Sequence, residues 1–178
     1  MTEATLDTTS PGVSDEPIEK QRADLFKRLE KTPTCILITH DDNGRMKTRP
    51  MTNQRVDDGG IIWMFIGADS HLAAEVTAHP DVLLTYADPG DSAYVAVRGH
   101  AAIVRNLEKA EEMWSKLAEA WFPEGPGDPN LALLRITMAS AEHWEPPNGK
   151  VLQFLEIAAA AITHKPPEHE DAYRKLDF

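Results

Sequence analysis

The chain has 178 residues, of which 42% are hydrophobic and 26% charged, and its formal net charge is −11 at pH 7. This length fits one domain with a sizeable core, and the acidic balance excludes a general nucleic-acid binder, because neutralising phosphates requires clustered Lys and Arg. The single cysteine excludes an intrachain disulfide. No apolar run approaches a membrane span, and the N-terminus lacks the features of a signal peptide, so we expect a cytoplasmic protein without a membrane partner.

The first half of the chain predicts one helix followed by three strands. Residues 1–16 are rich in Thr, Ser, Asp, Glu and Pro, and we expect them to form a disordered arm. Apolar residues at helical spacing predict a helix over 18–30. Apolar and β-branched runs between Gly-rich turns predict an antiparallel meander of strands at 34–40, 46–55 and 61–66. Pro50 cannot donate a ladder hydrogen bond, so it marks an edge, a bulge or a kink in the second strand.

The second half predicts two further helices and three further strands. A short helix over 70–79 is expected to be capped by Asp69 or Ser70. Regularly spaced apolar residues predict a long helix over 107–121. The strands are expected at 82–87, at 93–104 with a bulge or a close backbone approach at Gly99, and at 131–138 with a continuation at 141–144. Periodicity does not decide between strand and helix for 151–158.

This order of elements predicts a mainly β fold, a small antiparallel barrel of six strands with flanking helices. We assign the barrel domain to residues 17–160 and a polar C-terminal tail to residues 161–178. There are no internal repeats, and one domain accounts for the whole folded part.

A candidate anion site lies between the second predicted strand and the second predicted helix. Arg49 is on the strand, while Ser70 and His71 open the helix. The first backbone N–H groups of a helix lack partners within it, so a phosphate could be held between them and the guanidinium. The apolar run Trp63-Met64-Phe65 would offer a surface to a flat ring attached to that phosphate. On local evidence alone, a solvated arginine or a structural ion pair is the competing interpretation of Arg49.

Other chemical signatures do not emerge from the sequence. The seven histidines have no His-x-x-x-His spacing and there is no second cysteine, so no metal site is predicted. Gly-x-Ser-x-Gly and glycine-rich phosphate-loop motifs do not occur. No carboxylate is singled out by its surroundings, so catalytic residues stay unassigned. Trp114 and Trp121 are expected to serve core or dimer packing, with a ligand contact as the alternative.

Several segments, in one order, resemble the pyridoxamine 5′-phosphate oxidase-like family, and within it the bacterial general stress proteins. The resemblance extends over residues 18–178. It is carried by Lys47-Thr48-Arg49-Pro50-Met51, Ile62-Trp63-Met64-Phe65-Ile66, Asp69-Ser70-His71, Tyr94-Val95-Ala96-Val97-Arg98-Gly99-His100-Ala101, Ala120-Trp121-Phe122-Pro123-Glu124-Gly125-Pro126, Ala132-Leu133-Leu134-Arg135-Ile136 and Lys165-Pro166-Pro167-Glu168-His169.

The resemblance implies a Greek-key, split β-barrel homodimer that binds FMN, or FAD, in clefts at the subunit interface. The phosphate would be held by the strand around Thr48 and Arg49 and by the loop Ser70-His71-Leu72. The backbone at Pro50 and Met51 would face the isoalloxazine ring, beside the Trp63-Met64-Phe65 strand. An aromatic residue of the partner subunit, Trp121 or Trp144, would close the site.

One position departs from the family pattern. Relatives usually carry a lysine directly after Ser-His, whereas this chain has Leu72. A lost charge-assisted bond would weaken phosphate binding by about tenfold or more. The alternatives to a flavin-dependent oxidoreductase are therefore a binding or scaffold dimer that has lost tight flavin binding, and a reductase that uses a deazaflavin. Residues resembling the basic substrate-binding groups of true pyridoxamine 5′-phosphate oxidases are not present, so vitamin B6 oxidation is not predicted.

Overall fold

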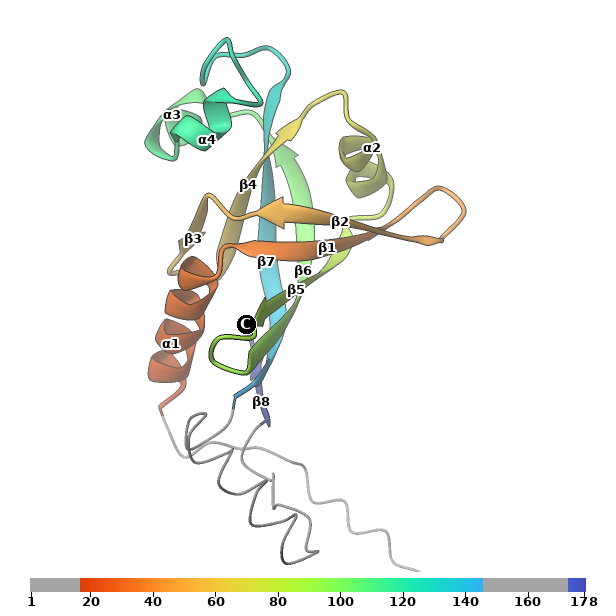
Figure 1. Cartoon of the computed structure of the whole chain (residues 1–178). Helices are drawn as coiled ribbons and strands as arrows, with labels where there is room; N and C mark the ends of the chain where they lie inside the picture. The colour runs from red at the N-terminus through yellow and green to blue at the C-terminus, as the bar shows by residue number, and fades with distance from the viewer. Residues whose placement is uncertain (1–16, 146–172) are drawn as a thin grey trace, which may run out of the picture.

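The structure is a computed structural model of the chain, and it describes residues 17–145 and 173–178. The predictions for residues 1–16, 151–158 and 165–169 lie outside the described residues. Within the described residues, antiparallel strands dominate and the helices lie around the sheet (Figure 1). The predicted mainly β class is confirmed.

In the part of the chain that the structure describes, eight strands form one antiparallel sheet that curls without closing. Hydrogen bonding links seven of them in the order β2-β1-β5-β6-β7-β4-β3, and β8 pairs with β7 beside this path. In chain order the elements are α1 (Ile18–Lys31), β1 (Thr34–His40), β2 (Met46–Thr52), β3 (Arg55–Asp57), β4 (Ile61–Gly67), α2 (His71–Ala78), β5 (Asp81–Asp88), β6 (Ala93–Val104), α3 (Leu107–Glu112), α4 (Lys116–Glu119), β7 (Leu131–Trp144) and β8 (Tyr173–Asp177).

The predicted strand number and strand pairing were wrong in two respects. The strand expected over 46–55 is divided into β2 and β3, and β8 was not predicted. The first three strands do not form a meander, because β4 pairs with β7 and not with β2. Among the described strands, β2 pairs with β1 alone, so Pro50 lies on an edge strand, one of the three placements (edge, bulge or kink) that its missing N–H predicted.

The bulge predicted at Gly99 is confirmed. The register of β6 against β7 shifts between Arg98 and Gly99. A Cβ atom at Gly99 would lie 2.7 Å from both Ile136 Cγ2 and the Thr137 carbonyl oxygen. The glycine thus allows a close backbone approach where the two longest strands bend together.

The single helix predicted over 107–121 was wrong, because the chain is broken into α3 and α4. Ser115 interrupts the helix by acting as an N-cap, and its hydroxyl oxygen accepts from the Ala118 N–H at 3.3 Å. The break turns Met113 and Trp114 toward the sheet, where Met113 is buried. Tertiary packing therefore overrides the helical periodicity here.

The core has two parts because β4 is buried on both faces. Its residues Ile62, Met64 and Ile66 lie in the main core with α1 and α2. Trp63 and Phe65 point to the opposite face, where they meet α3, α4 and the following loop. Figure 1 shows α3 and α4 on one side of the ends of β4 and β7 and α2 on the other. None of the described helices is long and apolar enough to cross a membrane.

Candidate functional site

An apolar groove of about 290 Å³ lies between the end of β2, the end of β4 and α4. It brings together chain segments that are far apart in the sequence. This cavity is called the apolar groove below. It is lined by Pro50, Met51, Thr52, Gln54, Phe65, Gly67, Leu117, Ala118, Trp121 and Phe122. Four of the predicted cofactor residues, Pro50, Met51, Phe65 and Trp121, thus line the same groove.

The groove has a fixed aromatic floor and an open wall. The ring centroid of Phe65 lies 5.6 Å from that of Trp114 and 6.4 Å from that of Phe122, so the Phe65 ring is held by both neighbours. Phe65 and Phe122 line the groove, whereas Trp114 does not. On the wall, Leu117 and Trp121 are 58% and 77% exposed. A preformed floor suits a flat ring, and exposed large apolar side chains at its rim mark a surface that another molecule covers.

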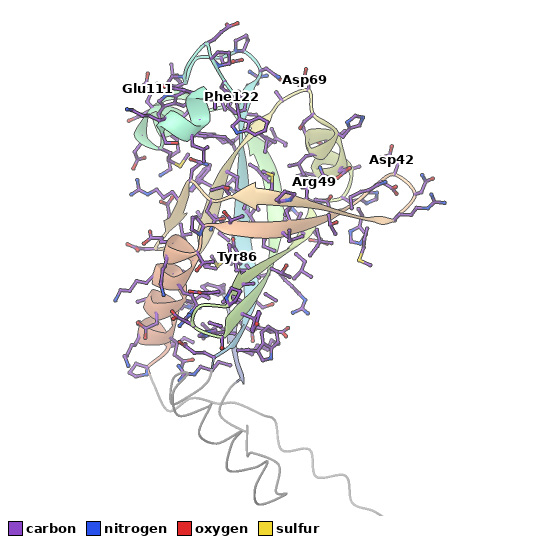
Figure 2. All side chains as sticks on the ribbon, in the orientation of Figure 1. Asp42, Arg49, Asp69, Tyr86, Glu111 and Phe122 are labelled. Carbon is purple, nitrogen blue, oxygen red and sulfur yellow. The ribbon has the colours of Figure 1, made fainter. Side chains whose placement is uncertain are left out.

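Arg49 immediately precedes the groove residue Pro50 on β2, and its guanidinium is already paired. Its Nη2 donates to Glu75 Oε2 of α2 at 2.5 Å and lies 3.4 Å from the hydroxyl of Thr39. The Thr39 hydroxyl in turn donates to the same Glu75 oxygen at 2.6 Å. In Figure 2, Arg49 lies on β2, toward α2. The structural ion pair considered for Arg49 is therefore present, and the Arg49 side chain remains 23% exposed.

The start of α2 uses the predicted residues in different ways. Ser70 is the N-cap, and its hydroxyl oxygen accepts from the Ala73 N–H at 3.2 Å. His71 is exposed at the first turn. Leu72 is 6% exposed and packs into the main core. Its position therefore lies inside the protein, and it does not extend toward an anion at the helix start.

Two of the three aromatic or apolar residues expected on β4 do not reach the groove. Met64 is fully buried in the main core. Trp63 is buried beneath α3, where its Nε1–H donates to Asp57 Oδ2 at 2.7 Å and Lys109 Nζ lies 5.5 Å from the ring centroid. Because successive side chains of a strand point to opposite faces, Met64 faces away from the groove. Trp63 shares the face of Phe65 but is covered by α3, so Phe65 is the member of this run that lines the groove.

Thr48 and Trp144 also lie outside the groove. Thr48 is exposed on β2. Trp144 is at the far end of β7, whereas Phe65 pairs with Leu133 near the beginning of that strand. At about 3.3 Å per residue, this places Trp144 about 35 Å along the strand from the groove. Trp144 therefore cannot contribute to the groove of its own protomer.

The sequence analysis missed several residues that shape the site. Leu117, Phe122 and Gln54 line the groove, and Glu75 holds Arg49. The aromatic Phe122 directly follows Trp121 and could have been found as part of an apolar pair. Glu75 gave no local signal, because its partners Thr39 and Arg49 are on two other elements.

The remaining reactive groups described do not form a second centre. Burial raises the pKa of the Cys35 thiol to about 12, so it is an inert buried thiol at neutral pH. Among residues 17–145 and 173–178, there is no group of three or more His, Cys, Asp or Glu side chains placed to hold a metal ion.

Comparison with known proteins places the chain in a family. The family model of pyridoxamine 5′-phosphate oxidase-like proteins matches residues 20–168. The chain is similar to the crystal structure of a protein from Jannaschia sp. CCS1 assigned as general stress protein 26, with 31% identity, a TM-score of 0.70 and coverage of 88% of this chain and 99% of that one.

The chain is also similar to two further proteins. The general stress FMN/FAD binding protein of Xanthomonas citri has 27% identity and a TM-score of 0.61, over 71% of this chain and 89% of that one. Protein bli-3 of Neurospora crassa is 22% identical over 174 residues, covering 92% of this chain and 80% of the relative. The chain therefore belongs to the pyridoxamine 5′-phosphate oxidase-like family, in its general stress protein group.

Proposed function

We propose that this protein binds FMN, with the isoalloxazine ring in the apolar groove and the phosphate near Arg49. The observation that carries the proposal is the groove itself: Pro50 and Met51 of an edge strand, Phe65 of β4 and Trp121 after α4 lie around one cavity. An apolar floor suits a flat ring, and Arg49, which directly precedes Pro50 on the same edge strand, is the cation proposed to meet the phosphate.

The proposed site suits the isoalloxazine ring better than it suits the phosphate group. Phe65 and Phe122 form an apolar floor, and Trp114, which does not line the groove, packs against the Phe65 ring. At the phosphate end, Arg49 is paired with Glu75, and the Ser70 hydroxyl, as helix cap, can still donate its hydrogen. The name of the Xanthomonas citri relative covers both FMN and FAD, so FAD is the second flavin to test.

The groove is proposed to be completed by a second copy of the chain. Leu117 and Trp121 leave one wall apolar and exposed, and contact with a partner subunit would bury it. In this homodimer, Trp144 would have to come from the partner subunit to approach the flavin. Size-exclusion chromatography with light scattering, run with and without FMN, measures the oligomeric state and its dependence on the flavin.

A flavin-dependent oxidoreductase activity is proposed as the consequence of binding. The flavin supplies the redox chemistry, while the protein determines its placement, its exposure to water and the charges around it. A binding or scaffold dimer with weak flavin affinity is the second candidate, because Leu72 is buried and Arg49 is neutralised by Glu75.

A visible absorption spectrum of the purified protein, repeated after incubation with FMN and desalting, tests the proposal. Flavin bands that survive desalting are expected. Phe65→Ala removes an aromatic ring of the floor and is expected to release the flavin. Met46→Ala, at an exposed position of β2, the strand that carries Pro50 and Met51, serves as the control. A colourless protein after both steps, at intact fold, favours the scaffold function instead.

A further inference from the structure

The pairing of Arg49 with Glu75 bears on which flavin the proposed site accepts. Glu75 Oε2 accepts two hydrogen bonds, from Arg49 Nη2 at 2.5 Å and from Thr39 Oγ1 at 2.6 Å. Thr39 is fully buried, and the side chains of Arg49 and Glu75 are 23% and 12% exposed. These three residues, hereafter the Thr39–Glu75–Arg49 cluster, connect β1, α2 and β2. A buried hydroxyl therefore fixes the carboxylate against the guanidinium.

The cluster presents a negative charge at the same guanidinium that a flavin phosphate would approach. A phosphate monoester carries roughly −1.5 to −2 charges at neutral pH. It would be attracted by Arg49 and repelled by Glu75, and neither charge is fully screened by water at this exposure. The cluster as a whole is neutral, so the net attraction for a terminal phosphate is small.

The residues described near Arg49 do not add a positive charge that would offset Glu75. Leu72 is apolar and buried one turn before Glu75. Lys47, two residues before Arg49 on β2, has Asp41 Oδ2 3.4 Å from its Nζ atom. His71 is exposed at the beginning of α2. The described fixed charge nearest to Arg49 is therefore the Glu75 carboxylate that contacts it.

We propose that Glu75 determines the ligand specificity of this site: by neutralising Arg49, it makes the site accept the same ring almost equally well with and without a terminal phosphate. The inference rests on the proposed function, because it presumes that the groove holds a flavin ring. The expected ligand class is then an isoalloxazine with a ribityl chain, of which riboflavin is the neutral form and FMN the phosphorylated form. The ring contacts supply most of the affinity.

Titration of the full-length protein with FMN and with riboflavin, followed by quenching of flavin fluorescence, tests this specificity. For the wild-type protein, FMN is expected to bind less than about tenfold more tightly than riboflavin. Glu75→Gln removes the charge but keeps a carbonyl oxygen that can accept from Thr39 and Arg49. This variant is expected to bind FMN about tenfold more tightly, with a change of less than about threefold for riboflavin.

Glu112→Gln is the matched control. Glu112 also pairs with an arginine, Arg55, but lies on α3 and does not line the groove. It changes the net charge of the protein by the same amount, so an unchanged ratio of FMN to riboflavin affinity in this variant excludes a general charge effect. Thermal melting of all three proteins shows whether each is folded during the titration.

Two results would overturn the inference while leaving flavin binding intact. One is a Glu75→Gln variant whose affinity ratio is unchanged or lower, since Glu75 would then serve to hold Arg49 in place. The other is a wild-type preference for FMN above about 100-fold, a measurement that needs no variant and so stands even where Glu75→Gln does not fold. If neither the wild-type protein nor Glu75→Gln binds either flavin, the proposed function itself fails.

Discussion

Replacing Leu72 by lysine tests whether this position belongs to the core or to the phosphate end of the site. Leu72 is 6% exposed and packs with Ala73 and Val76 against the main core. Removing a buried leucine side chain costs about 2–5 kcal/mol, and an ammonium group in its place must either be desolvated or lose its proton. We therefore expect Leu72→Lys to lower the free energy of unfolding by about 3–5 kcal/mol. This is a large share of the roughly 5–15 kcal/mol that stabilises a typical domain.

Urea unfolding at pH 7 and pH 9 measures this loss, and Leu72→Met is the matched control, with an expected loss below about 1.5 kcal/mol. A buried lysine has a lower pKa in the folded state than the roughly 10.4 of the unfolded chain. Between these two values the unfolded state binds more protons, so the stability of the variant rises with pH relative to the wild-type protein. The deficit is therefore expected to be smaller at pH 9 than at pH 7.

One outcome would refute this reasoning. A Leu72→Lys variant that unfolds at the wild-type urea concentration at both pH values, and binds FMN about tenfold more tightly, would show that the side chain at this position reaches the proposed phosphate site. The core position of Leu72 would then be of no consequence for binding.

Three further predictions follow from contacts elsewhere in the fold. Gly99→Ala is expected to lower the free energy of unfolding by about 1–3 kcal/mol, because the new Cβ meets Ile136 and the Thr137 carbonyl at 2.7 Å; urea unfolding measures it, and unchanged stability would contradict the close approach. Trp121→Ala is expected to weaken the proposed dimer in light scattering while changing the stability of the fold by less than about 0.5 kcal/mol, since the side chain is 77% exposed; a stable dimer without flavin binding would favour a ligand contact. Burial, and then Arg28, lower the pKa of His143, so the unfolded state binds more protons as pH falls below about 6.5; stability should decrease from pH 7 to pH 5, and His143→Gln should reduce that slope in thermal melts.

The local elements could be read from the sequence because their causes are local. The helix at 18–30 and the irregularity at Gly99 follow from local patterns. For the cap of α2 and for Pro50, local chemistry narrowed the choice to Asp69 or Ser70 and to an edge, a bulge or a kink; the structure has the Ser70 cap and the edge. For the helix expected over 107–121, periodicity was misleading. Its apolar residues face two different surfaces, and Ser115 caps a new helix between them.

The candidate site was predictable only in part. The segments around Arg49, Phe65 and Trp121 were named from their resemblance to a family, and three separate elements place Pro50, Met51, Phe65 and Trp121 around one groove. The alternation of β4 decided that Phe65 faces the groove and that Met64 faces the core. The sequence contains this alternation, but it does not show which face meets which neighbour when both faces are apolar.

The sequence by itself determined the mainly β class, most element positions and the family of the chain, because these depend on periodicity, turn residues and ordered motifs. The tertiary structure alone decided that β4 pairs with β7, that Leu72 is buried, and that Glu75 and Thr39 hold Arg49. These contacts join residues from separate elements, so they arise only when the sheet curls and α2 packs against it. A charge pair between separate elements, such as Arg49 and Glu75, produces no periodic or local sequence pattern. Its proposed effect on ligand choice depends on the distance between the two side chains, which only the fold determines.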